Sequence, residues 1–323
     1  MKILLHLETK NDIRNDIIIN LKALDHEVYT IPNVNLYKLS YYDKFIHLIL
    51  FYLKITNNYI KNRKLKLEEK NKKYQREQIY RQKFDLALIF RADTVSDEDL
   101  ELYKKRSKKM VAYQWDGINR YENFHKKIDY FHKIYCFDPE DEKLPKIRFL
   151  PNFYFSHYAT YINSPVLIDL IYIGYFYQSR YDLLKKLSNK FPNLNCHFIL
   201  KSFNKQEIKL INASNFLIQQ DNVLAYEELM KIQSQANVIL DLKHEVHNGL
   251  SFRFFEGIVL QKKIITTNKS VINYDFYNSN NIFILDENNF NLVEEFLKTD
   301  YVVLDNKLIK KYSFENWFSI ISN

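Results

Sequence analysis

The stretch that most constrains the fold is residues 238–268, where two buried strands flank one apolar helix. Residues 238–242 form a near-continuous apolar run bounded by polar residues, which is typical of a strand buried on both faces. An apolar helix is predicted from about Leu250 to Gln261, and a second buried strand, Lys263 to Thr267, follows almost at once. Such strand–helix–strand units bind ligands at the carboxyl ends of their strands. The sequence therefore predicts an α/β sheet with a ligand site after residue 242.

The predicted helix carries two charged residues on an otherwise apolar surface. Gly249, Arg253 and Glu256 lie at i, i+4 and i+7, so they share one stripe. A glycine there lets a ligand approach free backbone amides at the positive end of the helix dipole. A phosphate would suit these amides and Arg253, whereas Glu256 would accept hydrogen bonds from sugar hydroxyls. The alternative is a structural Arg253–Glu256 ion pair between helices.

The composition indicates an ordinary globular protein with room for two domains. The chain has 323 residues, of which 46% are hydrophobic. The formal net charge of +8 permits attraction to phosphates or to an anionic membrane, but no nucleic-acid-binding motif accompanies it, so no nucleic-acid partner is expected. Cys136 and Cys196 lie in apolar, strand-like runs, and neither a signal peptide nor an apolar segment of ~20 residues is evident. These features predict a protein of the reducing cytoplasm.

The first half of the chain, residues 1–158, alternates strands and helices and predicts a Rossmann-like domain. Residues 36–83 interrupt this alternation with a long helical insertion. The run from Phe45 to Leu53 is nearly all apolar yet too short to span a bilayer, so it either packs as a core helix, which is the commoner outcome, or lies in a membrane interface. From Lys61 to Lys83 the insertion is strongly basic; a solvated helix face is the default interpretation, and a patch that rests on anionic headgroups is the alternative.

Acidic residues follow successive predicted strands of this half, namely Glu8, Asp93, Asp116 and Asp138. In a parallel sheet the carboxyl ends of the strands meet at one edge, above the usual binding crevice. Acidic residues at such positions also cap helices, so only one or two of the four are expected to have a chemical role. Trp115, beside Asp116, offers a ring face on which a sugar would stack, or else belongs to the core.

The second half, residues 159–323, starts the alternation again. The polar segment from Ser156 to Pro165 lacks helical periodicity and ends in a proline, which places the domain boundary there. Two α/β domains of similar size are therefore expected. Besides the 238–268 unit, strands are predicted at 168–173, 195–200 and 282–285, and helices at 181–191, 225–235 and 307–319.

The chain resembles the GT-B class of nucleotide-sugar glycosyltransferases over nearly its whole length. The likeness is closest to bacterial capsule and lipopolysaccharide glycosyltransferases related to the spore-maturation group. It implies two Rossmann-like domains that face each other across a cleft. The segments that carry it, in their order and spacing, are YQWDGINRY at 113–121, CFDPED at 136–141, YIGYFYQSRYDLL at 172–184, NGLSFRFFE at 248–256 and KKIITTNKSVINYDFYNSNNIFIL at 262–285.

In that class the carboxyl-terminal domain holds the nucleotide sugar and the amino-terminal domain receives the acceptor, usually without a bound metal. The resemblance makes Arg180, Arg253 and Glu256 residues of the donor site. It implies a nucleotide sugar and a glycan or lipid-linked glycan as partners, and no cofactor. Further residues implied in the same pocket are Gly174, Asn248, Gly249, Leu250, Thr267 and Asn268.

The sequence departs from the class at two points. Many retaining members carry two glutamates spaced E-x7-E, whereas here the first position is Asn248 and the second is Glu256. This difference leaves the stereochemical outcome open. No glycine precedes Gly117, so the phosphate-binding glycine loop found early in some members is missing.

Glycosyl transfer requires stabilisation of the charge that develops on the leaving nucleoside diphosphate. Backbone amides at a helix start and an arginine supply it without a metal, and Arg253 and Arg180 are the candidates. If the reaction inverts, a base from the opposing domain must take the proton of the acceptor hydroxyl. Asp116 is the best placed residue for this role, with Asp93 behind it.

Other interpretations stay open at this stage. His244 and His247 have the i, i+3 spacing of a metal pair, but two histidines in a loop are more often polar surface or donor contacts, so no metal is expected. A polyol-phosphate transferase or a nucleotide-sugar epimerase would have the same architecture. The non-enzyme alternative is a protein that only binds sugar nucleotides or a membrane surface. The favoured prediction is a hexosyltransferase-type enzyme of the cytoplasm, or one peripheral on the inner face of the cytoplasmic membrane.

Overall fold

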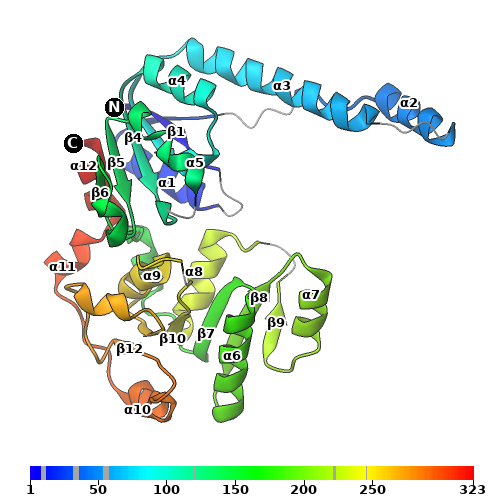
Figure 1. The fold of residues 1–323 in the computed structure, drawn as a ribbon. Helices are drawn as coiled ribbons and strands as arrows, with labels where there is room; N and C mark the ends of the chain where they lie inside the picture. The colour runs from blue at the N-terminus through cyan, green and yellow to red at the C-terminus, as the bar shows by residue number, and fades with distance from the viewer. Residues whose placement is uncertain (9–11, 32–35, 54–57, 119–120, 221–222, 245) are drawn as a thin grey trace.

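The computed structural model contains two parallel six-stranded sheets with flanking helices (Figure 1), which confirms the predicted α/β class with two Rossmann-like domains. The structure describes residues 1–8, 12–31, 36–53, 58–118, 121–220, 223–244 and 246–323. Residues 119 and 120 of the 113–121 motif therefore lie outside the described part of the chain.

The first sheet has the strand order β2-β1-β3-β4-β5-β6, and every neighbouring pair is parallel. Its central strands are apolar on both sides because helices cover both faces. The strands are β1 (Lys2–His6), β2 (Glu27–Thr30), β3 (Phe84–Phe90), β4 (Ser107–Gln114), β5 (Lys133–Cys136) and β6 (Ile147–Phe149), and the helices of this half are α1 (Ile13–Ala23), α2 (Tyr41–Tyr52), α3 (Tyr59–Tyr80), α4 (Asp97–Arg106) and α5 (Glu122–His125).

The second sheet has the order β12-β11-β10-β7-β8-β9 and is also parallel. The strand order reverses between β7 and β10, and this switch point is where open α/β sheets bind ligands. The predicted strand–helix–strand unit is present as β10, α9 and β11. The strands are β7 (Ile168–Tyr175), β8 (Cys196–Lys201), β9 (Leu217–Gln219), β10 (Ala236–Asp241), β11 (Lys263–Thr266) and β12 (Ile282–Ile284), and the helices are α6 (Gln178–Lys190), α7 (Lys205–Asn212), α8 (Tyr226–Ser234), α9 (Phe252–Leu260), α10 (Val293–Lys298), α11 (Asn306–Lys311) and α12 (Phe314–Ser322).

Some predicted elements differ from those in the structure. The single helix expected at 307–319 is two helices, because the Ser313 hydroxyl accepts a hydrogen bond from the Asn316 amide (3.3 Å) and begins α12 there. Within the segment Ser156 to Pro165, which was predicted to be a linker without helical periodicity, Ser156–Tyr161 forms a 3-10 helix. Between residues 201 and 219, where no element was predicted, the chain forms α7 and β9.

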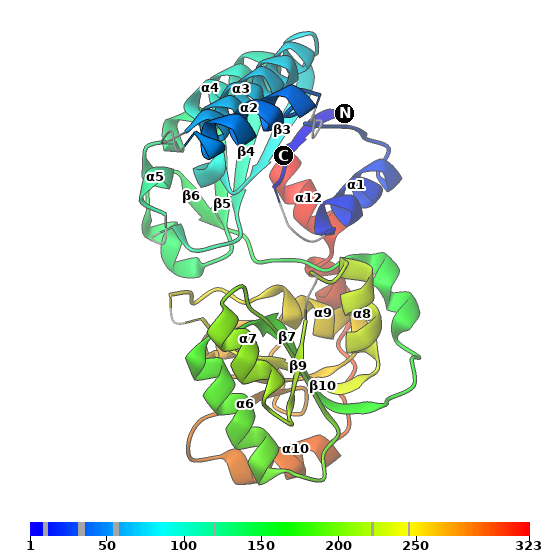
Figure 2. The ribbon, with the colours of Figure 1, turned by 90° about the vertical axis from the view of Figure 1, so that its right-hand side faces the viewer.

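The last helix returns to the first sheet, which a division of the chain at residue 158 did not anticipate. Trp317 of α12 stacks on Phe90 of β3 with ring centroids 5.7 Å apart, and its ring meets Tyr113 of β4 edge-on at 4.8 Å. The Lys109 ammonium donates to the Ser322 carbonyl at 2.9 Å. Figure 2 shows α12 beside α1 in the first domain. The chain therefore crosses between the domains twice.

Helices α2 and α3 form an arm that projects from the first domain (Figure 1). The apolar run at 45–53 does not pack in a core, so that prediction is wrong. In α2, Phe45, Leu48 and Phe51 are 58%, 53% and 70% exposed. In its described residues the insertion forms two helices, α2 and α3, which agrees with the predicted helical insertion. Within the described part of the chain, no helix has both the length and the apolar character needed to cross a bilayer.

Candidate active site

A cavity of about 470 Å³ lies between the two domains. Trp115 and Asp116, which follow β4, line it from the first domain, and Tyr175 and Asp241, at the ends of β7 and β10, line it from the second. We call it the first cavity. Because it opens at the switch point of the second sheet, it occupies the position at which such folds bind ligands.

A second cavity, of about 500 Å³, adjoins the first and shares part of its wall. Glu8 and Arg91, beyond the carboxyl ends of β1 and β3, line it from the first domain. Lys201 and Gln220 line it from the second domain. The shared wall consists of Trp115, Tyr175, Arg180, Leu229 and Arg253.

Two arginines of this shared wall lie close together. Arg180, in the first turn of α6, and Arg253, in the first turn of α9, both approach the ring of Tyr172, with guanidinium carbons 6.0 and 5.2 Å from its centroid. Arg180 donates to the carbonyls of Leu242 (3.1 Å) and Tyr175 (3.4 Å), and among the described residues no carboxylate pairs with it. Burial, together with the charge of Arg253, lowers the pKa of Arg180. The wall therefore carries positive charge that an anion would compensate.

Asp241 is the carboxylate nearest to this pair. It is buried at the end of β10, where it accepts hydrogen bonds from the hydroxyls of Ser251 (2.6 Å) and Thr266 (2.9 Å). A guanidinium nitrogen of Arg253 lies 3.7 Å from a carboxylate oxygen of Asp241, and Arg253 also donates to the Ile173 carbonyl. Although burial lowers the pKa of Arg253, the nearby Tyr172 and Asp241 raise it overall. Arg253 thus pairs with Asp241, and the alternative of a structural Arg253–Glu256 pair does not describe the site.

Glu256 lies in the first cavity with its carboxylate held by helix α8. The Tyr226 hydroxyl donates to one oxygen and the Gln233 amide to the other, both at 2.9 Å. Glu256 is only 3% exposed, and burial raises its pKa although the two hydrogen bonds oppose this shift. Each carboxylate oxygen retains a second lone pair, so Glu256 can still accept from a ligand hydroxyl. Gln233 is also buried, and its amide oxygen has no hydrogen-bond partner among the residues that the structure describes.

The loop that precedes α9 is docked on the first domain. The Asn248 amide donates to Asp138 (2.7 Å), and the Asn152 side chain donates to the Leu250 carbonyl (3.0 Å). Gly249 lines the first cavity, but a Cβ atom on it would lie 2.5 Å from the carbonyl oxygen of Phe137. A glycine is therefore required for close approach of the two domains, a constraint that the sequence alone did not reveal.

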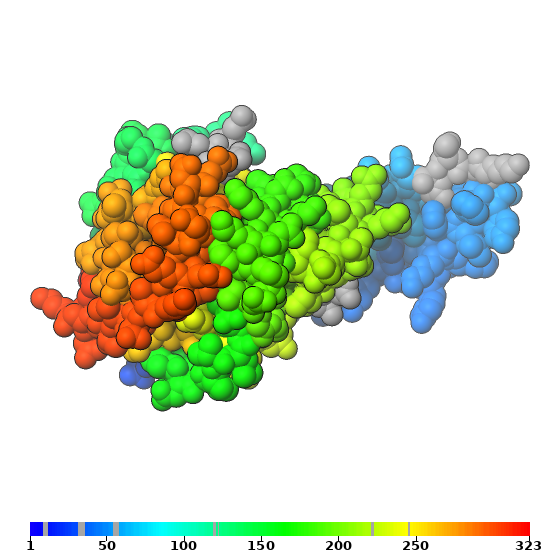
Figure 3. All heavy atoms as spheres, turned by 90° about the horizontal axis from the view of Figure 1, so that it is seen from below, coloured from blue at the N-terminus to red at the C-terminus, as the bar shows by residue number. Residues whose placement is uncertain are grey.

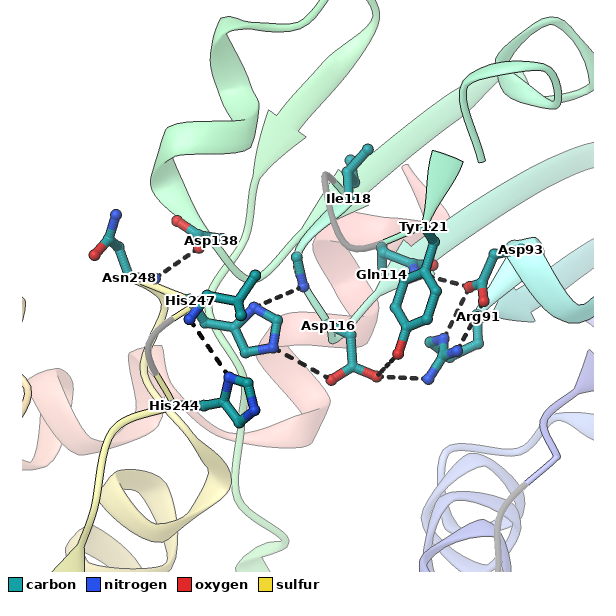
Figure 4. A network of polar contacts seen from close by, with 12 residues as sticks. Arg91, Asp93, Gln114, Asp116, Ile118, Tyr121, Asp138, His244, His247 and Asn248 are labelled. Atoms are coloured by element: carbon teal, nitrogen blue, oxygen red, sulfur yellow. Dashed lines mark hydrogen bonds and ion pairs between the residues drawn. The ribbon is translucent and has the colours of Figure 1, made fainter. Parts of the chain in front are cut away.

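Asp116 belongs to a polar network at the carboxyl edge of the first sheet (Figure 4). Arg91 donates to Asp93 through two nitrogens, at 2.8 and 2.7 Å, and to Asp116 through a third, at 2.5 Å. Its guanidinium also lies 4.0 Å from the centroid of the Tyr121 ring, and the Tyr121 hydroxyl is 3.4 Å from Asp116. Arg91 adopts a left-handed backbone conformation (φ 54°), which is costly for a residue with a Cβ and is often found at functional sites.

His247, from the second domain, completes this network. Its Nδ1 accepts a hydrogen bond from the Gly117 amide at 3.2 Å, so a neutral ring carries its proton on Nε2. Nε2 lies 3.8 Å from the nearer oxygen of Asp116. His244 packs beside it, with ring centroids 5.5 Å apart. No group of three His, Cys, Asp or Glu side chains within the described residues is arranged to hold a metal ion.

The structure brings together most, but not all, of the site residues predicted from the sequence. Arg180, Gly249, Arg253, Glu256 and Asn268 line the first cavity together with Asp116 and Trp115, and Gly174 lines the second. Three predicted residues are not among those that line the two cavities. Asn248 is exposed and accepts from Lys243 (2.8 Å), the Leu250 side chain is in the core, and the Thr267 hydroxyl accepts from the Lys243 amide (2.9 Å). Asp93 accepts two hydrogen bonds from Arg91 and is not among the residues that line the two cavities.

Other residues of the site were not predicted from the sequence. Arg91 directly follows β3, so its position at the sheet edge was available as a signal. Tyr226 and Gln233 are seven residues apart and therefore share a face of α8, a spacing that an ordinary polar face would also show. Asp241 is the last residue of the apolar strand β10, and ligands of open α/β sheets bind beyond the carboxyl ends of the strands.

Comparison with known proteins supports the architecture. No protein-family model and no curated protein matches the sequence. A glycosyltransferase from Rickettsia africae ESF-5 is 13% identical, with a TM-score of 0.52 over 99% of this chain and 96% of that chain. The trehalose-6-phosphate synthase OtsA is 10% identical, with a TM-score of 0.60 over 99% and 97%. A DNA-modifying β-glucosyltransferase, solved with and without its substrate uridine diphosphoglucose, is 12% identical, with a TM-score of 0.53 over 100% and 99%. The chain thus has the two-domain fold of the GT-B glycosyltransferases from end to end.

Proposed function

We propose that this protein is a glycosyltransferase that moves a sugar from a nucleotide-sugar donor to a cell-surface glycan. The observation that carries this proposal is the Arg180–Arg253 pair, whose charge is only partly compensated, on the wall shared by the two interdomain cavities. A diphosphate at this wall would leave one cavity on each side of it. A nucleotide sugar has that shape, with a nucleoside on one side of its diphosphate and a sugar on the other.

The donor contacts follow from the charges and donors of the second domain. Arg180 and Arg253 would bind the diphosphate, and Glu256 would accept from hydroxyl groups of the bound donor. The start of α9, capped by Ser251, adds the positive end of a helix dipole beside Gly249. These groups supply positive charge at the leaving group without a metal, and we propose that the reaction is metal-independent.

Asp116 is proposed as the residue that faces the acceptor hydroxyl from the first domain. In an inverting transfer the acceptor oxygen forms a bond to the anomeric carbon, the bond from that carbon to the diphosphate oxygen breaks, and the acceptor proton passes to the base. Arg91 would act as a positioning residue, because it donates to the Asp116 carboxylate, and His247 Nε2 lies 3.8 Å from the same carboxylate. Trp115, which lines both cavities, offers a ring face to a sugar.

The solved structures with this fold support the reaction class. The β-glucosyltransferase of phage T4 was solved with its UDP-glucose substrate, and AviGT4 is a glycosyltransferase of avilamycin A biosynthesis, with TM-scores of 0.51 and 0.57 to this chain. The acceptor class, a capsule or lipopolysaccharide glycan, rests on the resemblance of the five sequence segments quoted above. We therefore also propose that the enzyme works in the cytoplasm, at the inner face of the cytoplasmic membrane.

Product analysis tests this proposal. The protein is incubated with radiolabelled nucleotide sugars that differ in nucleotide and in sugar, together with lipid-linked or soluble glycan acceptors, and with duplex DNA as a contrasting acceptor. A labelled glycoside on the glycan that disappears with the Arg253→Ala variant is the expected result. A phosphodiester product or an epimerised nucleotide sugar would assign another reaction to the site, and nucleotide binding without any product would make the chain a binding protein.

A further inference from the structure

The most unusual surface of the molecule is the helix α2, at the free end of the arm. It reads YYDKFIHLILFY, and in the described chain only Asp43 of this helix is buried. A soluble protein rarely exposes so many large apolar side chains together without a partner for them. Those exposed are Tyr41 (90%), Tyr42 (71%), Phe45 (58%), Leu48 (53%), Ile49 (42%), Phe51 (70%) and Tyr52 (76%), followed by Leu53 (63%).

The exposure of α2 is a fixed feature, because Asp43 fastens the helix to α3. The Asp43 carboxylate accepts from the Ser40 amide (2.9 Å), the Tyr59 hydroxyl (3.0 Å) and Arg63 (2.8 Å). The Ser40 hydroxyl in turn accepts from the Asp43 amide (3.1 Å) and completes a capping box. Since Asp43 is held against α3, the opposite stripe of α2, which includes Phe45, must face away from the arm.

That outward stripe has a definite order. Tyr41, Phe45, Leu48 and Tyr52 are spaced by four, three and four residues, so they lie on one line along the helix. Tyrosines stand at both ends of the line and purely apolar side chains lie between them. Tyrosine is enriched where one end of a side chain is apolar and the other end is wet, as in the headgroup region of a bilayer.

The neighbouring helix α3 is basic and exposed. It carries three exposed glutamates, Glu68, Glu69 and Glu77, and a larger number of exposed lysines. Seen from the side of the second domain, the arm protrudes beyond the outline of the rest of the molecule (Figure 3). The exposed lysines of α3 are Lys61, Lys64, Lys66, Lys70, Lys72 and Lys73.

We propose that the α2–α3 arm is a membrane anchor that binds a bilayer containing anionic phospholipids. Helix α2 lies in the boundary between headgroups and acyl chains with its Tyr41–Tyr52 stripe inward, and the lysines of α3 contact the headgroup phosphates. A second copy of this chain fits less well, because pairing two arms through α2 would bring their basic α3 helices together. This inference extends the membrane location in the proposed function, but it does not depend on the glycosyl-transfer chemistry.

Vesicle flotation with the full chain tests the anchor in the absence of any sugar donor. The protein is mixed with vesicles of phosphatidylcholine alone or with vesicles that also contain phosphatidylglycerol, at low and at high NaCl. Binding to the anionic vesicles, weakened by salt, is the expected result. Replacing Lys61, Lys64 and Lys66 by glutamine should weaken this binding by about 100-fold, at about fivefold for each charge near the surface.

A second variant tests insertion of the apolar stripe. The triple change Phe45→Ser, Leu48→Ser and Tyr52→Ser should lower vesicle binding by at least about tenfold for each side chain. The fold and nucleotide affinity should not change, because these side chains are exposed and far from the cavities. Two matched triple variants outside the arm should leave vesicle binding unchanged. The control for the lysine variant combines Lys185→Gln, Lys190→Gln and Lys209→Gln, and the control for the serine variant combines Val166→Ser, Ile272→Ser and Val303→Ser.

Three outcomes would overturn the anchor. These are equal binding to neutral and anionic vesicles, no binding to either, and binding that survives both arm variants. A dimer in light scattering that the serine variant converts to a monomer would assign α2 to a second copy of the chain instead. None of these outcomes bears on glycosyl transfer to a soluble acceptor, so the anchor and the proposed enzyme activity can fail independently.

Discussion

Replacing Arg253 by alanine should weaken the binding of nucleoside diphosphates without unfolding the protein. Arg253 lines both cavities and, with Arg180, provides the positive charge of their shared wall. Loss of a hydrogen bond to a charged group costs about 1.5–3 kcal/mol, which corresponds to an increase in Kd of about 10- to 150-fold. Titration calorimetry with UDP, GDP and their sugars measures this change directly.

The fold should survive because Asp241, the partner of Arg253, keeps other donors. Its carboxylate still accepts from the hydroxyls of Ser251 and Thr266, at 2.6 and 2.9 Å, so the variant does not leave a buried carboxylate without hydrogen bonds. Arg76→Ala is the matched control. It also removes a guanidinium with carboxylate partners, Glu98 and Asp99, but far from the cavities, and nucleotide affinity should be unchanged.

A double-mutant cycle sharpens the argument. If Arg180 and Arg253 hold the same diphosphate, the loss in the double alanine variant should differ from the sum of the two single losses by more than about 0.5 kcal/mol. Additive losses would mean that the two arginines act on separate groups. Unchanged affinity in a folded Arg253→Ala variant would refute the assignment of the shared wall to the diphosphate.

Three further predictions follow from single sites. Asp116→Asn should retain nucleotide affinity while turnover falls by roughly 10²–10⁴-fold, the usual contribution of a general base, and unchanged turnover would make the residue structural. Gly249→Ala should destabilise the contact between the two domains by about 1–3 kcal/mol, because its Cβ would lie 2.5 Å from the Phe137 carbonyl oxygen; thermal unfolding would show the loss. His6 is buried beside Tyr103, and burial lowers its pKa from 6.5 to about 4. Between pH 6.5 and about 4 the imidazole is therefore protonated in the unfolded chain but neutral in the folded protein, so the free energy of unfolding decreases as the pH falls through this range. The loss amounts to about 3 kcal/mol, at about 1.4 kcal/mol per pH unit, and urea unfolding of His6→Leu should show a smaller decline between pH 7 and 4.

The fold was largely predictable because its strands are buried on both faces. Runs such as FDLALIF in β3 and ANVILD in β10 leave no polar side for solvent, and only a covered parallel sheet accommodates several of them. The split between α11 and α12 was not predictable from periodicity, because α11 has only six residues and the break is marked by the cap at Ser313. Short elements such as β9, with three residues, carry too little pattern to detect.

The site was less predictable than the fold, because its partners come from distant parts of the chain. Glu256 was singled out as a charge on an apolar helix, but the donors that hold it, Tyr226 and Gln233, lie on another helix. Likewise Arg91 and Asp116 follow different strands, and although both are expected at the same sheet edge, nothing local to either predicts that they form an ion pair. The sequence could not decide whether α2 is buried or exposed, since an apolar sequence is compatible with a protein core and with a bilayer alike.

The scarcity of glycine points to what the interdomain contact must preserve. The chain has only 4 glycines, and two of them, Gly117 and Gly249, lie where the domains meet. A Cβ on Gly117 would lie 2.7 Å from Nδ1 of His247, and one on Gly249 would reach the backbone of Phe137. His247 and Gly249 both belong to the loop between β10 and α9, and this loop leads directly into α9, which carries Arg253. The contact that sets the position of the proposed diphosphate site therefore also sets the position of Asp116, and a change that separates the domains should impair both together.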